Sequence, residues 1–307
     1  MTAQIFIDGA VGTTGLEIAE RLTGRSEFTL ITLPEDRRKD DDARAQALNS
    51  ADFVILCLPD EAAKAAVGMI SNPDVRVIDA SSAHRVADGW TYGFPEVVGH
   101  QAVAEAGRVS NPGCYPTGFI ALISPLIRAG LLPADWPYTC NAVSGYSGGG
   151  KALIGRFEED ADIAFRDYGM TMGHKHVPEM QKLTGIALPP VFSPAVIPAH
   201  RGMVVEVPLN LAAMPVAAEP QVLRLCLVDA YAGSPIVTVH DDTPGEVLLR
   251  RSMQPTDRLD LWVFGSADGS QARLIAVLDN LGKGASGAAV QNLNLMAGLP
   301  ETTGLRL

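Results

Sequence analysis

Short apolar runs alternate with segments of helical spacing along the first third of the chain. The apolar runs are almost continuous, as at 28–33 and 51–58, rather than alternating with polar residues. Continuous apolar strands separated by helices are typical of a parallel sheet covered on both faces. We therefore predict strands at 4–8, 28–33, 51–58 and 75–80. The first helix is expected to turn one apolar face inward, made of Leu16, Ile18, Ala19 and Leu22.

The pattern changes after residue 115. Apolar and polar positions now alternate more strongly, and fewer helices are expected between the strands. Such alternation is typical of half-buried strands in a mixed or antiparallel sheet. The candidate strands are 138–144, 191–197, 203–209, 236–240, 258–264 and 273–278. The chain then enters a glycine-rich loop at 280–287 and a helix at 288–296. The fold expected is α/β followed by α+β.

Composition narrows the functional class. Hydrophobic residues make up 47% of the 307 residues, enough for a large core, and no apolar run approaches the roughly 20 residues of a membrane span. The first residues lack a basic signal-peptide region, so we expect no targeting segment. The net charge of −11 argues against nucleic acid as a partner. The four cysteines are widely spaced, which argues against a zinc site and against a disulfide framework and fits a reducing cytoplasm.

Glycines at 9, 12 and 15 follow the first strand and open the first helix. In this context the first glycine permits a tight turn, the second lets the backbone approach a pyrophosphate, and the third lets helix and strand pack closely. The alternative is a purely structural turn, but the strand–loop–helix context favours dinucleotide binding. The loop residues expected to bind the cofactor are Gly9, Ala10, Gly12, Thr13, Thr14 and Gly15.

Charged residues after the second strand bear on the choice of cofactor. An acidic side chain here would bind a ribose 2′-hydroxyl, whereas an arginine would bind a 2′-phosphate. Both kinds are present, but the basic run that includes Arg37 and Arg38 favours NADP(H). The alternative is an ordinary solvated loop.

Cys114 lies directly after a Pro-Gly pair, where an apolar helix is expected to begin. A helix N-terminus presents unpaired N–H groups and partial positive charge, which lower a thiol pKa and favour a nucleophilic thiolate. The competing interpretation is a small buried apolar residue, the usual role of a free cysteine.

An activated cysteine together with a nicotinamide cofactor indicates redox chemistry through a thioester. Collapse of the reduced intermediate to an aldehyde needs a general acid/base, most often histidine. Two of the six histidines, His174 and His176, lie close to Glu179, which is expected to orient one imidazole. A metal site or a structural role competes with this interpretation.

These motifs resemble, in order and over nearly the whole chain, the N-acetyl-gamma-glutamyl-phosphate reductase family in its shorter bacterial form. The most specific segment is VSNPGCYPTGFIALISP at 109–125; DASSAHR at 79–85 and HKHVPE at 174–179 also match. The resemblance implies NADPH-dependent reduction of N-acetyl-glutamyl 5-phosphate to the semialdehyde in arginine biosynthesis.

The resemblance also implies residue roles and a domain plan. Cys114 would be the nucleophile and His174 the acid/base, with His176 second, and Ser81 would contact the cofactor. The family fold implies a Rossmann-type domain over 1–115, completed by a C-terminal helix at 283–307. A catalytic and oligomerisation α+β domain would span 116–282. A homo-oligomer, dimer or tetramer, is expected.

The substrate's phosphate and carboxylate need cationic partners, and arginine matches both groups with two parallel bonds. Candidates in glycine- or proline-bounded loops are Arg85, Lys151, Lys175 and Arg201, with His200 beside the last. His84 and His200 stand where the longer form of the family has other residues, so the resemblance assigns them no role. Each candidate could instead be an ordinary surface charge.

Other activities use the same parts. Aspartate-semialdehyde dehydrogenase and a reductase of carrier-bound aminoadipyl phosphate share the thioester logic. From other classes, a cysteine acyltransferase or hydrolase without nicotinamide, or a non-catalytic dinucleotide sensor, remains possible on the residues alone. The strand–loop–helix context disfavours the acyltransferase or hydrolase, and Cys114 at a helix start disfavours the sensor.

Overall fold

The chain divides into two units, each built around its own sheet, in a computed structural model that describes residues 2–307. Unit 1 contains residues 2–112 and Ala285–Leu305. Unit 2 contains Gly113–Gly284 and Arg306–Leu307. The fold class predicted from the sequence, a parallel-sheet unit and a mixed-sheet unit, is confirmed.

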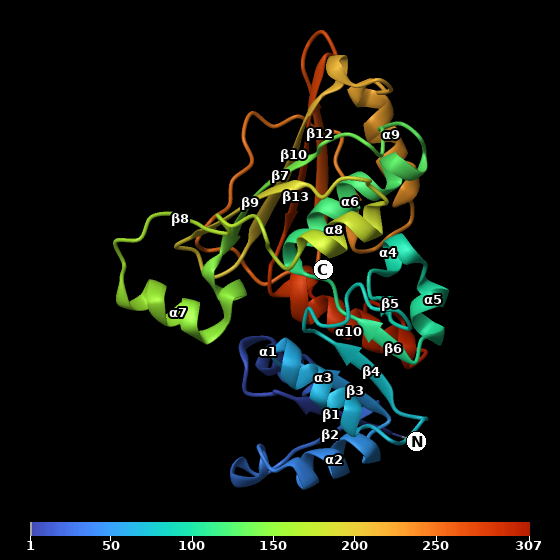
Figure 1. Cartoon of the computed structure of the whole chain (residues 1–307), viewed down its shortest axis with the longest axis vertical. Helices are drawn as coiled ribbons and strands as arrows, with labels where there is room; N and C mark the ends of the chain where they lie inside the picture. Colours follow the sequence, from blue (N-terminus) through green and yellow to red (C-terminus); the bar gives the residue numbers. More distant parts are fainter. Residues whose placement is uncertain (1) are drawn as a thin grey trace. The chain divides into compact units, whose positions relative to one another are not determined.

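Unit 1 holds a six-stranded sheet in the order β2-β1-β3-β4-β6-β5 (Figure 1). Every neighbouring pair is parallel, as the continuous apolar runs predicted. The strands are β1 Ala3–Asp8, β2 Phe28–Ile31, β3 Phe53–Leu56, β4 Arg76–Asp79, β5 Thr91–Tyr92 and β6 Arg108–Ser110. Strand β2 ends before the predicted boundary at 33, shortly ahead of Pro34, which has no N–H group to donate to a strand ladder.

The helices of unit 1 are α1 Thr13–Leu22, α2 Asp41–Ser50, α3 Asp60–Met69, α4 Pro95–Val98, α5 His100–Glu105 and α10 Gly287–Met296. The predicted apolar face of α1 is wrong in one position. Leu16 is 52% exposed, and the helix buries Gly15, Ile18 and Leu22 instead. Helix α10 packs against α1 and α5. All of its residues except Leu295 are buried, so it forms part of the core of this unit.

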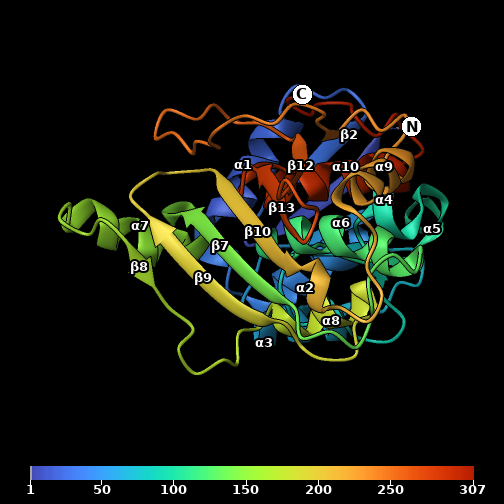
Figure 2. The ribbon, with the colours of Figure 1, turned by 90° about the horizontal axis from the view of Figure 1, so that it is seen from above.

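Unit 2 holds a seven-stranded mixed sheet in the order β11-β12-β13-β10-β7-β9-β8 (Figure 2). Its strands are β7 Thr139–Gly145, β8 Arg166–Asp167, β9 Val191–Ile197, β10 Met203–Asn210, β11 Val237–Val239, β12 Leu259–Gly265 and β13 Gln271–Leu278. Helix α6, Cys114–Arg128, packs on one face of it. A Cβ atom built on Gly118 of α6 would lie 2.8 Å from Val205 and 3.2 Å from Ala276. The close packing of helix on sheet explains the glycine.

Two expectations for this half of the chain are wrong. The glycine-bounded loop in which Lys151 was expected is a short 3₁₀-helix, Tyr146–Gly149, followed by helix α7, Gly150–Glu159. The glycine-rich loop expected at 280–287 contains a π-helix, Gly282–Ser286. Glycine-rich segments lack the periodic apolar pattern on which helix prediction rests, so neither helix was visible in the sequence. The other helices of unit 2 are α8 Val177–Thr184 and α9 Pro220–Ala230.

Candidate active site

The glycine loop of unit 1 has the geometry expected of a phosphate-binding turn. Gly9 has φ +90°, and a Cβ on it would lie 2.3 Å from the carbonyl oxygen of Cys57. A Cβ on Gly15 would lie 2.5 Å from the carbonyl oxygen of Gly9. Gly12 caps the N-terminus of α1, whose free N–H groups favour an anion. The turn between β1 and α1 therefore cannot carry side chains at Gly9 or Gly15.

A cavity of about 550 Å³ lies beside this loop. Gly9 and Ala10 line it on one side, and the basic side chains Arg38, Lys39 and Arg44 also contribute to its wall. The two predicted phosphate-binding arginines are separated by the structure. Arg38 lines the cavity, whereas Arg37 lies outside its lining and approaches Asp40 at 3.7 Å.

Arg44 is a cavity residue that the sequence analysis missed. Its guanidinium donates to Asp8 at 2.8 and 3.2 Å and to Asp41 at 3.1 Å. The hydrogen bond to Asp8 raises the pKa of Arg44. The acidic run in which Arg44 stands reads as a solvated helix start, so its tie to the end of β1 could not be seen from the sequence.

At the end of β4 the fully buried Asp79 organises a polar cluster. Its carboxylate accepts hydrogen bonds from the N–H and hydroxyl of Ser81 at 2.9 and 2.7 Å. It also lies 2.6 Å from Nδ1 of His84, whose ring stacks on Trp90 at 4.2 Å between centroids. The predicted cofactor contact Ser81 is thus held in a fixed rotamer by its neighbour.

Arg85 bonds to backbone carbonyls within unit 1. Its Nε donates to the carbonyl oxygen of Asn111 at 3.1 Å, and one terminal nitrogen donates to that of Ala80 at 3.4 Å. These bonds tie the segment after β4 to the segment that leads toward Cys114. A role in holding this backbone therefore stands beside the predicted contact with substrate.

In unit 2, Cys114 is the first residue of α6, as the sequence predicted. The side chain is half-buried and forms no disulfide. Gly113 caps the helix, and its N–H donates to the carboxylate of Glu179 at 3.1 Å. Glu179 is 1% exposed, so this contact joins a buried carboxylate of α8 to the start of α6.

The histidine pair gathers around the same helix start. His176 caps α8, and the rings of His174 and His176 lie 4.7 Å apart. Both contact the ring of Tyr115, at 6.3 and 5.8 Å between centroids. The residue beside Cys114 therefore touches both candidate acid/base groups.

Tyr168 belongs to this cluster and was missed in the sequence analysis. Its ring lies 5.6 Å from that of His174, and its hydroxyl donates to the hydroxyl of Tyr115 at 3.4 Å. Burial raises the pKa of Tyr168, and the negative charge of a Cys114 thiolate raises it further. Because a single tyrosine in a loop carries no motif, only the fold reveals its place near the cysteine.

The remaining basic candidates lie in different surroundings. Lys151 is exposed on α7, and His200 is exposed with its ring edge on Tyr146. Arg201 donates to the buried carboxylate of Asp279 at 2.8 Å. Among residues 2–307 no group of three or more His, Cys, Asp or Glu side chains is arranged to hold a metal ion. No helix in the same range is long and apolar enough to cross a membrane.

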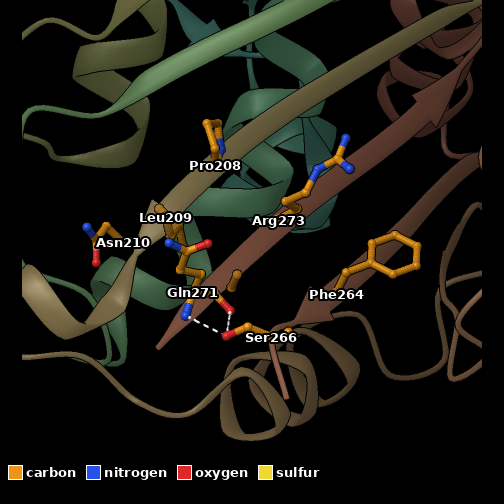
Figure 3. Close-up of a pocket in the computed structure, with 9 residues that line it drawn as sticks. Pro208, Leu209, Asn210, Phe264, Ser266, Gln271 and Arg273 are labelled. Carbon is orange, nitrogen blue, oxygen red and sulfur yellow. Dashed lines mark hydrogen bonds between the residues drawn. The ribbon is translucent and has the colours of Figure 1, made fainter. Parts of the chain in front are cut away.

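A second cavity, of about 540 Å³, lies on unit 2 where β10 and β12 end and β13 begins (Figure 3). Pro208, Phe264, Gln271 and Arg273 line it. It contains none of the predicted site residues, which directs attention to the glycine loop and to Cys114.

Known proteins with similar sequences identify the family. Residues 4–106 match the semialdehyde dehydrogenase NAD binding domain, and residues 114–280 match the semialdehyde dehydrogenase dimerisation domain. N-acetyl-gamma-glutamyl-phosphate reductase 2 of Pseudomonas putida is 48% identical, over 99% of both chains. N-acetyl-gamma-glutamyl-phosphate reductase of Burkholderia lata is 51% identical, over 97% of both.

Solved structures agree on the fold. Aspartate semialdehyde dehydrogenase II of Vibrio cholerae, in complex with ASA, superposes with a TM-score of 0.71, at 19% identity and over 97% of this chain and 99% of that one. The matching sequences confirm the resemblance drawn from the motifs. The chain belongs to the N-acetyl-gamma-glutamyl-phosphate reductase family, within the semialdehyde dehydrogenases.

Proposed function

We propose that this chain reduces N-acetyl-glutamyl 5-phosphate to N-acetyl-glutamate 5-semialdehyde, with release of phosphate, using NADPH in arginine biosynthesis. One observation carries the proposal: a cysteine at the first residue of a helix, with two imidazoles and a buried carboxylate around that helix start. The sequence identity of 48% and 51% with two reductases of that name supports the same substrate.

The two units divide the work in this proposal. Unit 1 binds NADP(H): the side-chain-free turn at Gly9 and Gly15 fits a pyrophosphate, and Arg38 with Lys39 fits a 2′-phosphate. NADPH, when bound, supplies the hydride for the reduction. Ser81, held by Asp79, is the further cofactor contact expected from the family motif.

Unit 2 supplies the nucleophile. Sγ of Cys114 attacks the carbonyl carbon of the acyl phosphate, and N–H groups at the start of α6 stabilise the oxyanion that forms. The bond to the phosphate oxygen then breaks and leaves a thioester on Cys114. After hydride addition, the hydroxyl of the thiohemiacetal loses its proton, the C–S bond breaks, and the aldehyde departs as the thiol is restored.

Proton transfer in these steps falls to the histidine pair. His174 is half-buried and is proposed as the acid/base, with His176 as the second choice. Glu179 is buried, accepts the N–H of Gly113, and lies on the helix that His176 caps, so α8 connects the pair to the start of α6.

A second copy of the chain is the proposed partner. Val205 and Ala276 face α6, so the alternate residues Val204 and Val277 point to the opposite face of the sheet. The half-buried side chain of Trp262 lies on that face too. The match of residues 114–280 to a dimerisation domain supports a homodimer formed through this face. Four widely spaced cysteines that form no disulfide support a cytoplasmic location.

The test is a spectrophotometric assay in the reverse direction. Purified protein is mixed with N-acetyl-glutamate semialdehyde, phosphate and NADP, and phosphate-dependent NADPH absorbance is followed. Aspartate semialdehyde is run in parallel. We expect turnover with the N-acetyl substrate alone. Turnover only with aspartate semialdehyde moves the chain to the sister activity, and none with either from protein that binds NADP contradicts the proposal.

A further inference from the structure

The turn 279–284 of unit 2 lies directly against the nucleophilic cysteine. A Cβ built on Gly284 would lie 2.9 Å from the Cβ of Cys114 and 3.3 Å from its Cα. Cβ contacts under 3.0 Å are essentially never seen, so any side chain at 284 would force either Cys114 or the turn to shift. The backbone at Gly284 thus packs directly against the side chain of Cys114, and we call this backbone segment, 279–284, the wall of the cysteine site.

Backbone hydrogen bonds hold the wall in shape. The carbonyl oxygen of Asp279 accepts the N–H groups of Gly282 and of Gly284, both at 3.0 Å. A π-helix begins at Gly282, and such turns are rare and occur frequently at functional sites. A Cβ on Gly282 would lie 1.8 Å from the carbonyl oxygen of Thr256, so this end of the turn is also confined.

The side chain of Asp279 anchors the turn to its surroundings. This carboxylate is 0% exposed and accepts hydrogen bonds from Arg201 at 2.8 Å, Leu281 N–H at 2.9 Å and Thr256 N–H at 3.3 Å. The charge-assisted bond to Arg201 is the strongest type among these. Because the carboxylate and the carbonyl of one residue serve the same turn, Asp279 couples Arg201 to Gly284.

Asn280 adds a second anchor. Its side-chain oxygen accepts the N–H of Gly202 at 2.8 Å, and its amide donates to the hydroxyl of Ser147 at 2.9 Å. The network therefore reaches from the loop before β10 to the turn beside the cysteine, and its members Ser147, Asp279 and Asn280 are buried.

We propose that Gly284 is a positioning residue for Cys114, held in place by the Arg201–Asp279 pair. The proposal rests on the thioester function proposed above. Without a Cβ at 284 the turn lies against the first carbon of the cysteine side chain and limits the directions that Sγ can take. Arg201, a candidate for substrate contact on sequence grounds, acts here through Asp279.

A Gly284→Ala variant tests this, with Gly155→Ala on α7 as the matched control, because a Cβ on Gly155 meets nothing within 4 Å. Three quantities are measured: kcat and KM, the dissociation constant for NADPH, and the rate of Cys114 alkylation by iodoacetamide against pH. A displacement of roughly 1 Å costs about a hundredfold in rate. We expect kcat of Gly284→Ala to fall on that scale and its alkylation profile to shift, with NADPH binding unchanged. Gly155→Ala should match the wild type in all three.

Wild-type kcat and alkylation in a folded, NADPH-binding Gly284→Ala variant would overturn the proposal. Should that variant not fold, Asp279→Asn removes the charge that holds Arg201 without changing the volume. It is expected to lower kcat and to shift the alkylation profile in the same way, and a profile like the wild type's overturns the proposal. Alkylation and NADPH binding need no substrate, so they report on Gly284 even if the proposed reaction fails in wild type.

Discussion

At the residue scale, the surroundings of the thiol distinguish Cys114 from Cys57 and Cys140. Cys114 is half-buried at a helix N-terminus, where free N–H groups favour its thiolate. Burial raises the pKa of Cys57 to about 12 and raises that of Cys140 as well. A thiol whose pKa is raised remains protonated at neutral pH, and a protonated thiol is a poor nucleophile.

Iodoacetamide at neutral pH is therefore expected to modify Cys114 before Cys57 or Cys140. Peptide mass spectrometry over a time course checks this order. Because Cys57 ionises only near pH 12 in the folded chain, raising the pH to 9 should leave it unmodified. Early modification of Cys57 would contradict the burial argument.

His174→Ala is expected to lower kcat at least about a hundredfold, the usual scale for loss of a general acid/base. His100→Ala is the control, since His100 is exposed on unit 1 and pairs with Glu301 at 3.0 Å. Steady-state kinetics of both variants and of His176→Ala decide the assignment. A loss confined to His176→Ala would transfer the role to that residue.

At the scale of elements, the 3₁₀ turn after β2 determines which of two neighbouring arginines reaches the cavity. Glu35–Arg37 forms this turn, and the chain beyond it carries Arg38 to the cavity wall while Arg37 faces Asp40. The sequence predicted that one of the two arginines reads the 2′-phosphate. The geometry of the turn favours Arg38.

Arg38→Ala is expected to weaken NADP binding about tenfold to a hundredfold, since a hydrogen bond to a charged group contributes roughly 1.5–3 kcal/mol. Binding of NAD should change little, because NAD lacks the 2′-phosphate. Titration calorimetry with both cofactors measures the difference. Arg37→Ala is the matched control, and an equal loss of NADP affinity in that variant would contradict the choice of Arg38.

Strand and loop elements were largely predictable because their signals are local. Continuous apolar runs predict the parallel strands, and closely spaced glycines between a strand and a helix predict the phosphate-binding turn. The inward face of α1 was mispredicted at Leu16, since Gly15 rather than a large apolar residue makes the close contact. Spacing identifies a helix but does not reveal which side a tight turn will press against the sheet.

The site was predictable only where a motif carries it. Cys114 and the histidine pair stand in specific segments, and the structure brings the pair to the cysteine's neighbour Tyr115. Tyr168 and Gly284 were missed because their importance depends on contacts with residues distant in sequence. No local pattern encodes a glycine that must accommodate a cysteine from another part of the chain.

On the scale of the whole molecule, the proposed dimer interface is the face of the unit 2 sheet opposite α6, which contains Val204, Val277 and Trp262. Figure 3 shows Arg273 and Phe264 on neighbouring strands of the sheet, close to the second cavity. Arg273 bonds to Glu206 across the strands. A central apolar area with a charged pair is the anatomy expected of a protein interface.

Val204→Arg is expected to convert a dimer to a monomer, because it buries an unpaired charge at the interface. Sedimentation velocity measures the change. The matched control is Val222→Arg, on exposed α9 at the helix-covered side of the sheet. A dimer that survives Val204→Arg, or dissociates with Val222→Arg instead, would place the interface elsewhere.

The proposed reaction depends on a thioester intermediate on Cys114, which intact-protein mass spectrometry can detect. The protein is incubated with N-acetyl-glutamate semialdehyde and NADP but without phosphate, so that the acyl group cannot leave as acyl phosphate. We expect one N-acetyl-glutamyl adduct on the Cys114 peptide, formed together with one equivalent of NADPH. Added phosphate should remove the adduct, and the Cys114→Ser variant should form none. NADPH formation without an adduct, or turnover by Cys114→Ser, would contradict the thioester.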